Sequence, residues 1–297
     1  MRVPVPIART LMGATAGLFT PGAVPVGLQR RCLDVVAGAA PGPAIAYAVE
    51  GGVAGERHRY GRDRALLYLH GGGYSIGSPR THRRVVARLA RSLDAEAFVP
   101  AYRLAPEHPY PAALDDTLAA YGSLTARFAE IVVAGDSAGG GLALALAIHA
   151  RDANMPAPAA LGLICPWLDL VGPHEDTGDP LITPARLEHW KNAYAPNNRH
   201  AVGVSPVLGD LSNLPPIVVH SAGGDPLRAD AERLAARISV EHRCYPGAFH
   251  AFHALAGITS QADEALDALA VSLRRLAGDS RRRRSARRVP GGSRRSG

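Results

Sequence analysis

Short apolar segments alternate with longer segments of helical periodicity along most of the chain. The apolar segments contain few polar residues, which is typical of strands that are covered on both faces of a sheet. They lie at residues 65–69, 95–101, 131–134, 159–165, 217–220 and 240–245. The helical segments lie at residues 81–92, 112–126, 140–151, 228–238 and 261–276. This alternation predicts an α/β fold with a mostly parallel central sheet and helices on both of its faces.

Two segments depart from this alternation. Residues 1–50 are rich in Pro, Gly and Ala and contain one stretch, residues 7–19, with the pattern of an amphipathic helix. Residues 170–206 combine prolines, glycines, mixed charges and a short aromatic patch, which indicates an insertion above the sheet. We therefore predict an N-terminal segment over residues 1–50, a main α/β domain over residues 51–278 with this insertion, and a tail over residues 279–297.

The positive charge of the chain is concentrated in this tail. The formal net charge is +7, but eight arginines and no acid follow Ser280, so the rest of the 297 residues is close to neutral. Clustered arginine is compatible with salt-sensitive binding to nucleic acid or to an anionic membrane. A solvated, disordered tail is the simpler interpretation, and we expect no specific nucleic-acid partner. With 47% hydrophobic residues, the remainder is large enough for one core.

The cysteines and the N-terminus give no sign of export or membrane insertion. Cys32, Cys165 and Cys244 are odd in number and far apart, and they lack the spacing of a zinc site or a redox pair. Arg9 interrupts the first apolar stretch before it reaches the length of a signal peptide, and no other stretch is long enough to span a bilayer. We expect a cytoplasmic protein with reduced thiols and no transmembrane anchor, and leave a homodimer open as its assembly.

A G-x-S-x-G sequence is the first candidate for chemistry. It consists of Gly135, Asp136, Ser137, Ala138 and Gly139 and stands between an apolar segment and an Ala/Leu-rich helical segment. This is the strand, turn and helix context in which the motif presents a nucleophile. Glycines allow the strand and the helix to approach closely, and the helix N-terminus favours developing negative charge. The alternative is a small-residue turn that happens to contain serine.

A glycine-rich sequence follows an earlier predicted strand. It consists of His70, Gly71, Gly72 and Gly73. Loops of this HGGG type supply backbone N–H donors to a substrate oxyanion in lipases and esterases, where a Cβ would obstruct the contact. A phosphate-binding loop is the competing interpretation, but the sequence lacks the lysine and hydroxyl of a P-loop and the spacing of a dinucleotide fingerprint.

An acid and two candidate bases follow the serine in the chain. Asp225 comes after the apolar segment 217–220 and a glycine turn, and His250 and His253 lie in a loop after the next predicted strand. The order Ser, Asp, His is that of an α/β-hydrolase triad, in which the acid orients the imidazole and the histidine takes the serine proton. Spacing alone leaves either histidine as the base. The remaining candidates that we assign to packing or to the surface are His82, His149 and His189.

Several motifs together make the chain resemble a known family. They are HGGGY at residues 70–74, YRLAPEHPYPAAL at 102–114, GDSAGGG at 135–141, PWLDL at 166–170, DPLR at 225–228 and HAF at 250–252. Over about residues 66–255 the sequence resembles the hormone-sensitive-lipase-like family of bacterial esterases. The resemblance implies an α/β-hydrolase fold, with a small helical cap built from the N-terminal segment and the later insertion. It also implies hydrolysis of short- to medium-chain acyl esters through an acyl-enzyme, with no metal and no cofactor.

The same resemblance assigns the site residues. The family histidine lies in an HGF sequence, so the match selects His250 over His253 and gives the triad Ser137, Asp225 and His250. It implies that the oxyanion donors are the N–H groups of Gly72, Gly73 and Ala138, with His70, Gly71, Gly135, Asp136 and Gly139 as supporting motif residues.

The chain departs from the family pattern in ways that leave these groups in place. Ala101 stands where an acid is usual, Ala251 replaces the glycine after the histidine, and Ala229 interrupts an acidic pair. Some relatives with this fold are receptors that bind a small ligand after losing the histidine, so a non-catalytic ligand-binding protein is the alternative function. The intact His250 argues against it.

Overall fold

A computed structural model describes residues 2–19, 24–38 and 45–288. An eight-stranded sheet forms the centre of the molecule. The strand order is β1-β2-β4-β3-β5-β6-β7-β8. The strands are β1 (Ala46–Glu50), β2 (Val53–Arg59), β3 (Arg64–Leu69), β4 (Glu96–Pro100), β5 (Glu130–Asp136), β6 (Ala160–Ile164), β7 (Ile217–Ala222) and β8 (Glu241–Tyr245). Strand β2 pairs antiparallel with β1 and β4, and the other neighbours pair parallel. The predicted fold class is therefore confirmed.

All six predicted strands are present, with ends that differ by at most two residues. The antiparallel hairpin of β1 and β2 was not predicted. Its first strand lies at the edge of the sheet and exposes Tyr47 and Val49, so it lacks the continuous burial that marks the central strands. Strand β1 begins at Ala46, within the predicted N-terminal segment of residues 1–50.

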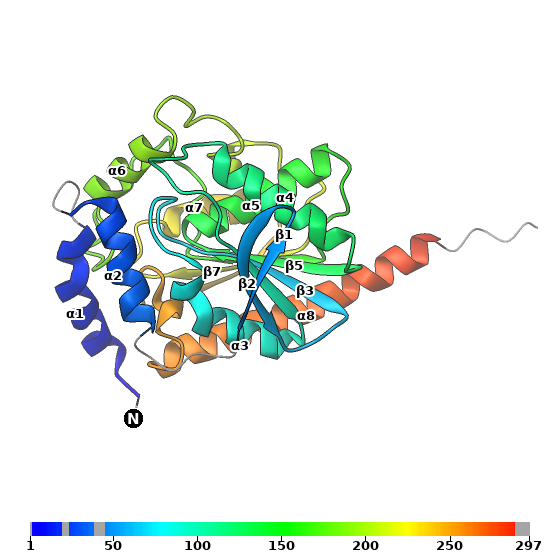
Figure 1. Cartoon of the computed structure of the whole chain (residues 1–297), viewed down its shortest axis with the longest axis horizontal. Coiled ribbons are helices and arrows are strands. Elements are labelled where there is room, and N and C mark those ends of the chain that lie inside the picture. The colour runs from blue at the N-terminus through cyan, green and yellow to red at the C-terminus, as the bar shows by residue number, and fades with distance from the viewer. Residues whose placement is uncertain (1, 20–23, 39–44, 289–297) are drawn as a thin grey trace, which may run out of the picture.

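Helices cover both faces of the sheet (Figure 1). Successive side chains of β3 illustrate the two layers, because Leu67 and Leu69 pack into one buried cluster and Leu66 and Tyr68 into the other. The first cluster is covered by α4 (Ala112–Thr125), α5 (Ala138–Asp152) and α7 (Arg228–Arg237). The second is covered by α3 (Arg83–Leu93) and α8 (Ser260–Arg288). This layering confirms the two-sided packing expected from the apolar strands.

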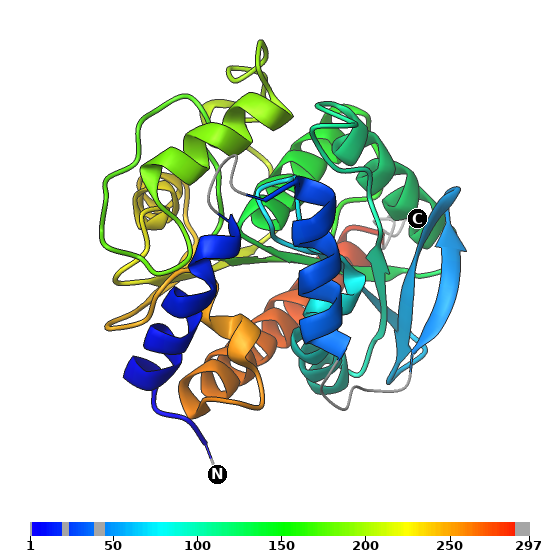
Figure 2. The same cartoon turned by 60° about the vertical axis from the view of Figure 1, so that its left-hand side comes forward.

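Three further helices gather beside one end of the sheet (Figure 2). They are α1 (Val5–Thr15), α2 (Val26–Gly38) and α6 (Pro184–Tyr194). Arg30 of α2 donates to the carbonyl oxygens of Ser75 and Ala105, in the loops that follow β3 and β4. Arg186 of α6 donates to the carbonyl oxygen of Ala16. The N-terminal segment and the insertion of residues 170–206 thus lie together above the carboxyl ends of the strands.

Short 3₁₀ helices complete the described structure, and the last helix is longer than predicted. The short helices are η1 (Ala16–Phe19), η2 (Pro79–His82), η3 (Pro206–Leu208) and η4 (Phe252–Leu255). We expected α8 to end near residue 276 and a disordered tail from residue 279, but the helix continues to Arg288. Gly278 weakens a helix without ending it, and the arginines that follow are good helix formers. The rest of the predicted tail, residues 289–297, lies outside the described residues.

Candidate active site

Ser137 occupies a sharp turn between β5 and α5. Its backbone has φ 53° and ψ −121°, and it stands at the N-terminal end of α5. A Cβ on Gly139 would lie 2.0 Å from the carbonyl oxygen of Leu69, and one on Gly135 would lie 2.4 Å from the carbonyl oxygen of Gly139. Only glycine fits at these two positions, which explains why the turn has the sequence G-x-S-x-G. The strained turn directs the serine away from the sheet.

The three residues predicted as a triad lie together although 113 positions separate Ser137 from His250. His250 Nε2 lies 2.9 Å from Ser137 Oγ, and His250 Nδ1 lies 3.0 Å from Asp225 Oδ2. Asp225 Oδ1 accepts the N–H of Leu227 at 2.8 Å. All three side chains are buried. Asp225 follows β7 and His250 follows β8, so the carboxyl ends of neighbouring parallel strands bring them to one edge of the sheet.

Burial and nearby carboxylates compete in setting the proton affinity of His250. Burial alone would lower its pKa. The charge and hydrogen bond of Asp225, with smaller contributions from the charges of Asp179 and Asp136, outweigh burial and raise the pKa above the ordinary imidazole value. The imidazolium that forms when the histidine takes a proton is therefore stabilised in this site.

His253, the other histidine of this loop, points to different neighbours. Its Nε2 lies 3.4 Å from His220 Nδ1, and its ring packs against Phe252. Burial, reinforced by the charge of His220, lowers its pKa well below the ordinary value. The structure brings His250, and not His253, to Ser137 and Asp225.

The HGGG loop adopts a backbone that only glycine accommodates readily. Gly72 has φ +121° and Gly73 has φ +58°. Within the described part of the chain, the N–H groups of these two glycines donate no hydrogen bond to the protein. Ala138 is the first residue of α5, where an N–H group has no acceptor within the helix. The three predicted oxyanion donors therefore remain available to a ligand.

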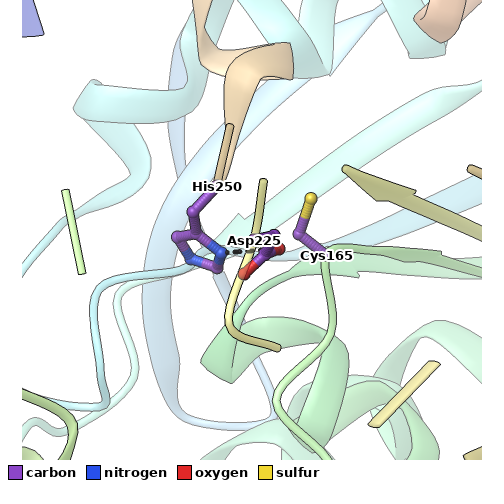
Figure 3. A group of neighbouring side chains, drawn as sticks. All are labelled: Cys165, Asp225 and His250. Carbon is purple, nitrogen blue, oxygen red and sulfur yellow. Dashed lines mark hydrogen bonds and ion pairs between the residues drawn. The ribbon is translucent and has the colours of Figure 1, made fainter. Parts of the chain in front are cut away.

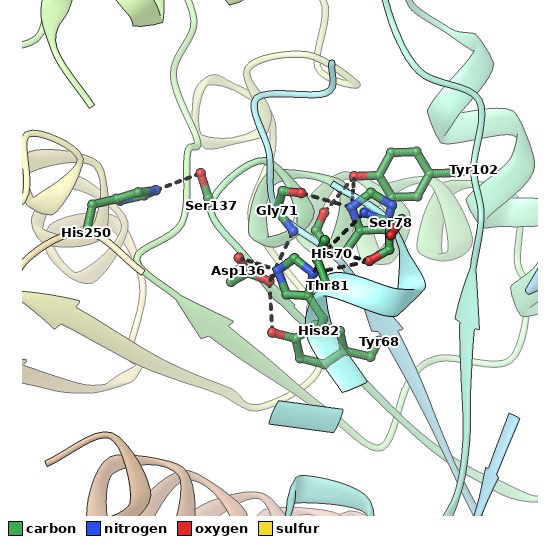
Figure 4. Close-up of polar contacts among 10 residues, drawn as sticks. All are labelled: Tyr68, His70, Gly71, Ser78, Thr81, His82, Tyr102, Asp136, Ser137 and His250. Atoms are coloured by element: carbon green, nitrogen blue, oxygen red, sulfur yellow. Dashed lines mark hydrogen bonds and ion pairs between the residues drawn. The ribbon is translucent and has the colours of Figure 1, made fainter. Parts of the chain in front are cut away.

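Asp136, directly before the serine, ties the serine turn to the HGGG loop (Figure 4). Its Oδ1 accepts the Tyr68 hydroxyl at 2.8 Å and the N–H of Gly71 at 3.1 Å. His82 Nε2 lies 3.3 Å from Asp136 Oδ2. Burial would raise the pKa of Asp136, but the charge and hydrogen bond of His82 and the bond from Tyr68 lower it to about 2. Asp136 therefore remains ionised and anchors the loop that carries the predicted oxyanion donors.

His82 is one of two supporting residues that sequence reasoning missed. We had assigned it to packing or to the surface, because nothing in the spacing of η2 connects it to a turn more than fifty residues away. Its pKa lies above the ordinary value, since burial is outweighed by the carboxylate of Asp136. His70 has a different role in the same loop. Its ring stacks on Tyr102 with centroids 4.2 Å apart, and burial lowers its pKa to about 3.

Asp179 is the second residue that was missed. It lies in the insertion of residues 170–206 and is only 5% exposed. Its Oδ2 accepts the backbone N–H of His250 at 2.6 Å. The mixed charges of the insertion gave no signal that one carboxylate would be buried against the predicted base.

Cys165 lies beside two residues of the predicted triad, Asp225 and His250 (Figure 3). Among the described residues, Cys165, Asp225 and His250 form the one group whose potential metal-ligand atoms all lie within 4.8 Å of one another. The carboxylate and imidazole are bonded to each other, and burial raises the pKa of the thiol well above its usual range. Because a metal ion binds the thiolate, we do not assign a metal to this group.

The cap reaches the HGGG loop directly. A Cβ on Gly73 would lie 2.4 Å from the Trp190 ring of α6, so the indole packs on the loop backbone. Tyr194 of the same helix stacks on Tyr74 with ring centroids 3.8 Å apart. Side chains of α6 therefore pack against the loop that carries two of the predicted oxyanion donors.

Comparison with known proteins agrees with this arrangement. A family model described as the alpha/beta hydrolase fold matches residues 66–254. The chain is 44% identical over 222 residues to a putative acetyl-hydrolase, LipR, of Mycobacterium tuberculosis, covering 70% of this chain and 72% of that protein. It is 35% identical over 231 residues to an acetyl-hydrolase of Streptomyces hygroscopicus, covering 73% and 77%.

Solved structures give the same result over a longer part of the chain. A crystal structure of an esterase from the bacterial hormone-sensitive lipase family has a TM-score of 0.85 and 31% identity, covering 93% of this chain and 100% of that one. A hormone-sensitive lipase from a metagenome library has a TM-score of 0.87 and 31% identity, covering 93% and 99%. The protein is an α/β-hydrolase that uses a serine to hydrolyse carboxylic esters. Within that class, the chain belongs to the hormone-sensitive-lipase-like family of esterases.

Proposed function

We propose that this esterase hydrolyses short- to medium-chain acyl esters, with Ser137 as nucleophile, His250 as base and Asp225 as the residue that orients the base. One observation carries the proposal: a continuous chain of contacts joins Ser137 Oγ to His250 Nε2 at 2.9 Å and His250 Nδ1 to Asp225 Oδ2 at 3.0 Å. These distances lie within hydrogen-bond reach, as a nucleophile and its base require.

In the first half of the reaction, Ser137 Oγ attacks the ester carbonyl carbon while its proton passes to His250 Nε2. The N–H of His250 Nδ1 is held by Asp225, which keeps the tautomer that leaves Nε2 free to accept. The oxyanion that forms is bound by the N–H groups of Gly72, Gly73 and Ala138. The alcohol then leaves with the proton from His250, and Ser137 keeps the acyl group.

In the second half, a water molecule attacks the acyl-enzyme. His250 Nε2 takes a proton from this water and returns it to Ser137 Oγ as the carboxylic acid departs. The same donors bind the second oxyanion. Since the imidazolium of His250 forms in both halves, the carboxylates that stabilise it contribute twice in each turnover.

The cap supports the proposed substrate class. Trp190 packs its indole on Gly73 of the HGGG loop, next to the place where the acyl group of a bound ester would lie. Aromatic walls bind small apolar groups and limit the length of a chain. Two relatives bear the name acetyl-hydrolase, which agrees with a short acyl group.

A series of nitrophenyl esters from acetate to decanoate tests this function. We expect kcat/KM to be highest for short or medium chains and to fall sharply for decanoate. Ser137→Ala should lower kcat on the order of a million-fold while the protein stays folded, because the triad acts as a unit. Substantial turnover by the homogeneous Ser137→Ala protein would remove Ser137 as the nucleophile, and rates that rise up to decanoate would overturn the chain-length assignment.

We propose that the protein is located in the cytoplasm. Cys32, Cys165 and Cys244 are unpaired, which supports a reducing compartment such as the cytoplasm. Among the described helices, none combines the length and apolar character needed to cross a bilayer. Cell fractionation checks the location, and sedimentation of the purified protein distinguishes a monomer from a homodimer.

A further inference from the structure

Asp179 joins the cap to the loop that carries the proposed base. Its Oδ2 accepts the backbone N–H of His250 at 2.6 Å. Its Oδ1 accepts the N–H groups of Leu181 at 2.8 Å and Ile182 at 3.1 Å, just before α6 begins. One buried carboxylate therefore binds three backbone donors, and these donors come from two segments that lie far apart in the sequence.

A buried carboxylate needs compensation, because removing a charge from water is costly. Burial, with a smaller contribution from the charge of Asp225, raises the pKa of Asp179 above its ordinary value, although the positive charge of His250 and the backbone donors act in the opposite direction. Arg186 of α6 lies close enough to interact with it electrostatically, but its guanidinium donates to the carbonyl oxygens of Leu181 and Ala16 instead. Compensation thus comes from N–H groups and from His250 when it is protonated.

The loop after His250 has a strained backbone. Ala251 has φ 53° and ψ 27°, a left-handed conformation that is unfavourable for residues other than glycine. The resemblance expected glycine at this position. The bond from the N–H of His250 to Asp179 holds the loop at the residue directly before this strained position.

We propose that Asp179 is a positioning residue, which fixes the main chain of His250 and, through its negative charge, favours the protonated imidazole that forms during the reaction. This inference rests on the proposed role of His250 as the base. Asp179 differs from Asp225 in its contact, because Asp225 binds the imidazole Nδ1 whereas Asp179 binds the main chain. The cap thereby contributes to the chemistry as well as to the substrate pocket.

Other groups around His250 limit how large the charge effect can be. Asp225 faces it from the loop after β7, and Asp136 contributes from the end of β5. His253 from the same loop, Cys165 from the end of β6 and Arg186 of α6 are further titratable groups close to this pair. Because Asp225 acts more strongly than Asp179, removing the charge of Asp179 should shift the titration of His250 without abolishing its function.

The test compares Asp179→Asn and Asp179→Ala, with Asp176→Asn as the matched control. Asparagine keeps the shape and one acceptor oxygen but removes the charge, whereas alanine removes both. Asp176 is an exposed aspartate of the same insertion whose Oδ1 accepts the N–H of Gly178, so its substitution makes the same change of charge away from His250.

We expect the acid limb of kcat/KM against pH to move to lower pH by about half a unit to one unit in Asp179→Asn, since a lost neighbouring carboxylate lowers an imidazole pKa. The plateau kcat should fall about tenfold in Asp179→Asn and about a hundredfold in Asp179→Ala, with KM within about threefold of the wild type, because the loss is in the transition state. Asp176→Asn should match the wild type in both respects.

Two results would overturn the inference. The first is an equal loss of kcat in both Asp179 variants while the acid limb of kcat/KM against pH stays at its wild-type position. This result would mean that the side chain contributes only packing. The other is wild-type kinetics in Asp179→Ala. Failure of the proposed function is separately visible, because Ser137→Ala would then retain turnover whatever the Asp179 variants do. Melting temperatures of the variants show whether a loss comes from unfolding.

Discussion

Two buried histidines in the loop after β8 have opposite electrostatic surroundings. His250 faces the carboxylates of Asp225 and Asp179, and its pKa is raised. His253 faces His220 and apolar rings, and burial lowers its pKa well below the ordinary value. Although only three positions separate them, the two rings contact different neighbours. Only the first has the contacts of a base that must accept a proton and hold it during turnover.

Substitution of each histidine tests this difference. His250→Ala should nearly abolish both ester turnover and labelling of Ser137 by an organophosphate, because a serine hydroxyl without its base is a weak nucleophile. His253→Ala should retain most of both activities. For the wild type, kcat/KM should rise with pH through one ionisation above the ordinary imidazole value, since the neutral ring accepts the proton. If the two variants behave the other way round at equal stability, the base is His253.

At the scale of elements, helix α6 and the loop before it bring two side chains to the candidate active site. The loop supplies Asp179, and the helix supplies Trp190, whose indole packs on Gly73. Thr183 caps the helix, and its side chain accepts the N–H of Arg186. The helix is therefore fixed at its N-terminal end, four residues after Asp179.

Trp190→Ala should widen the acyl pocket. We expect the ratio of kcat/KM for octanoate to that for acetate to rise by about tenfold or more, because two newly accommodated methylenes contribute about 0.8 kcal/mol each. His189→Ala, at an exposed neighbouring position of α6, is the control and should leave the ratio unchanged. A ratio that stays at the wild-type value in folded Trp190→Ala protein would show that the indole does not limit chain length.

At the scale of the whole molecule, buried neutral histidines make the fold sensitive to acid. Burial lowers the pKa of His58 to about 4 and those of His70 and His220 to about 3, and it lowers that of His253 well below the ordinary 6.5. As pH falls below 6.5, the unfolded chain takes up these protons while the folded chain does not. Stability contributed by the neutral forms is therefore present above pH 6.5 and is lost as pH falls toward the folded pKa values.

We expect the free energy of unfolding to fall by about 5 kcal/mol per pH unit between pH 6 and pH 5, since each of the four protons contributes about 1.4 kcal/mol per unit. Denaturant titrations across this range measure the slope.

His58→Leu should reduce this slope by about 1.4 kcal/mol per pH unit, because the unfolded chain then takes up one proton fewer. Both ring nitrogens of His58 are without hydrogen-bond partners among the described residues, so the substitution breaks no bond there. His200→Leu, at an exposed position, is the control. A wild-type slope of about 1.4 kcal/mol per pH unit or less, which corresponds to one proton or less, would contradict this account.

The sequence by itself determined the features that depend on neighbours along the chain. The central strands are apolar on both faces, so their burial was visible as continuous apolar segments. The turn at Ser137 and the HGGG loop need glycine for steric reasons at fixed spacings, so both could be recognised before the fold was known. Family resemblance was needed to choose between His250 and His253, because the order and spacing of the residues along the chain allow either histidine to be the base.

Tertiary structure decided what depends on contacts between distant segments. His82 lies in η2, Asp179 in the loop before α6, and Trp190 in α6. Nothing near these residues in the sequence indicates which loops their side chains contact. The edge hairpin of β1 and β2 was hidden because an exposed strand needs no apolar pattern. Side chains that support a site act across space, and their energies come from burial and charge in the assembled core, which composition and periodicity do not encode.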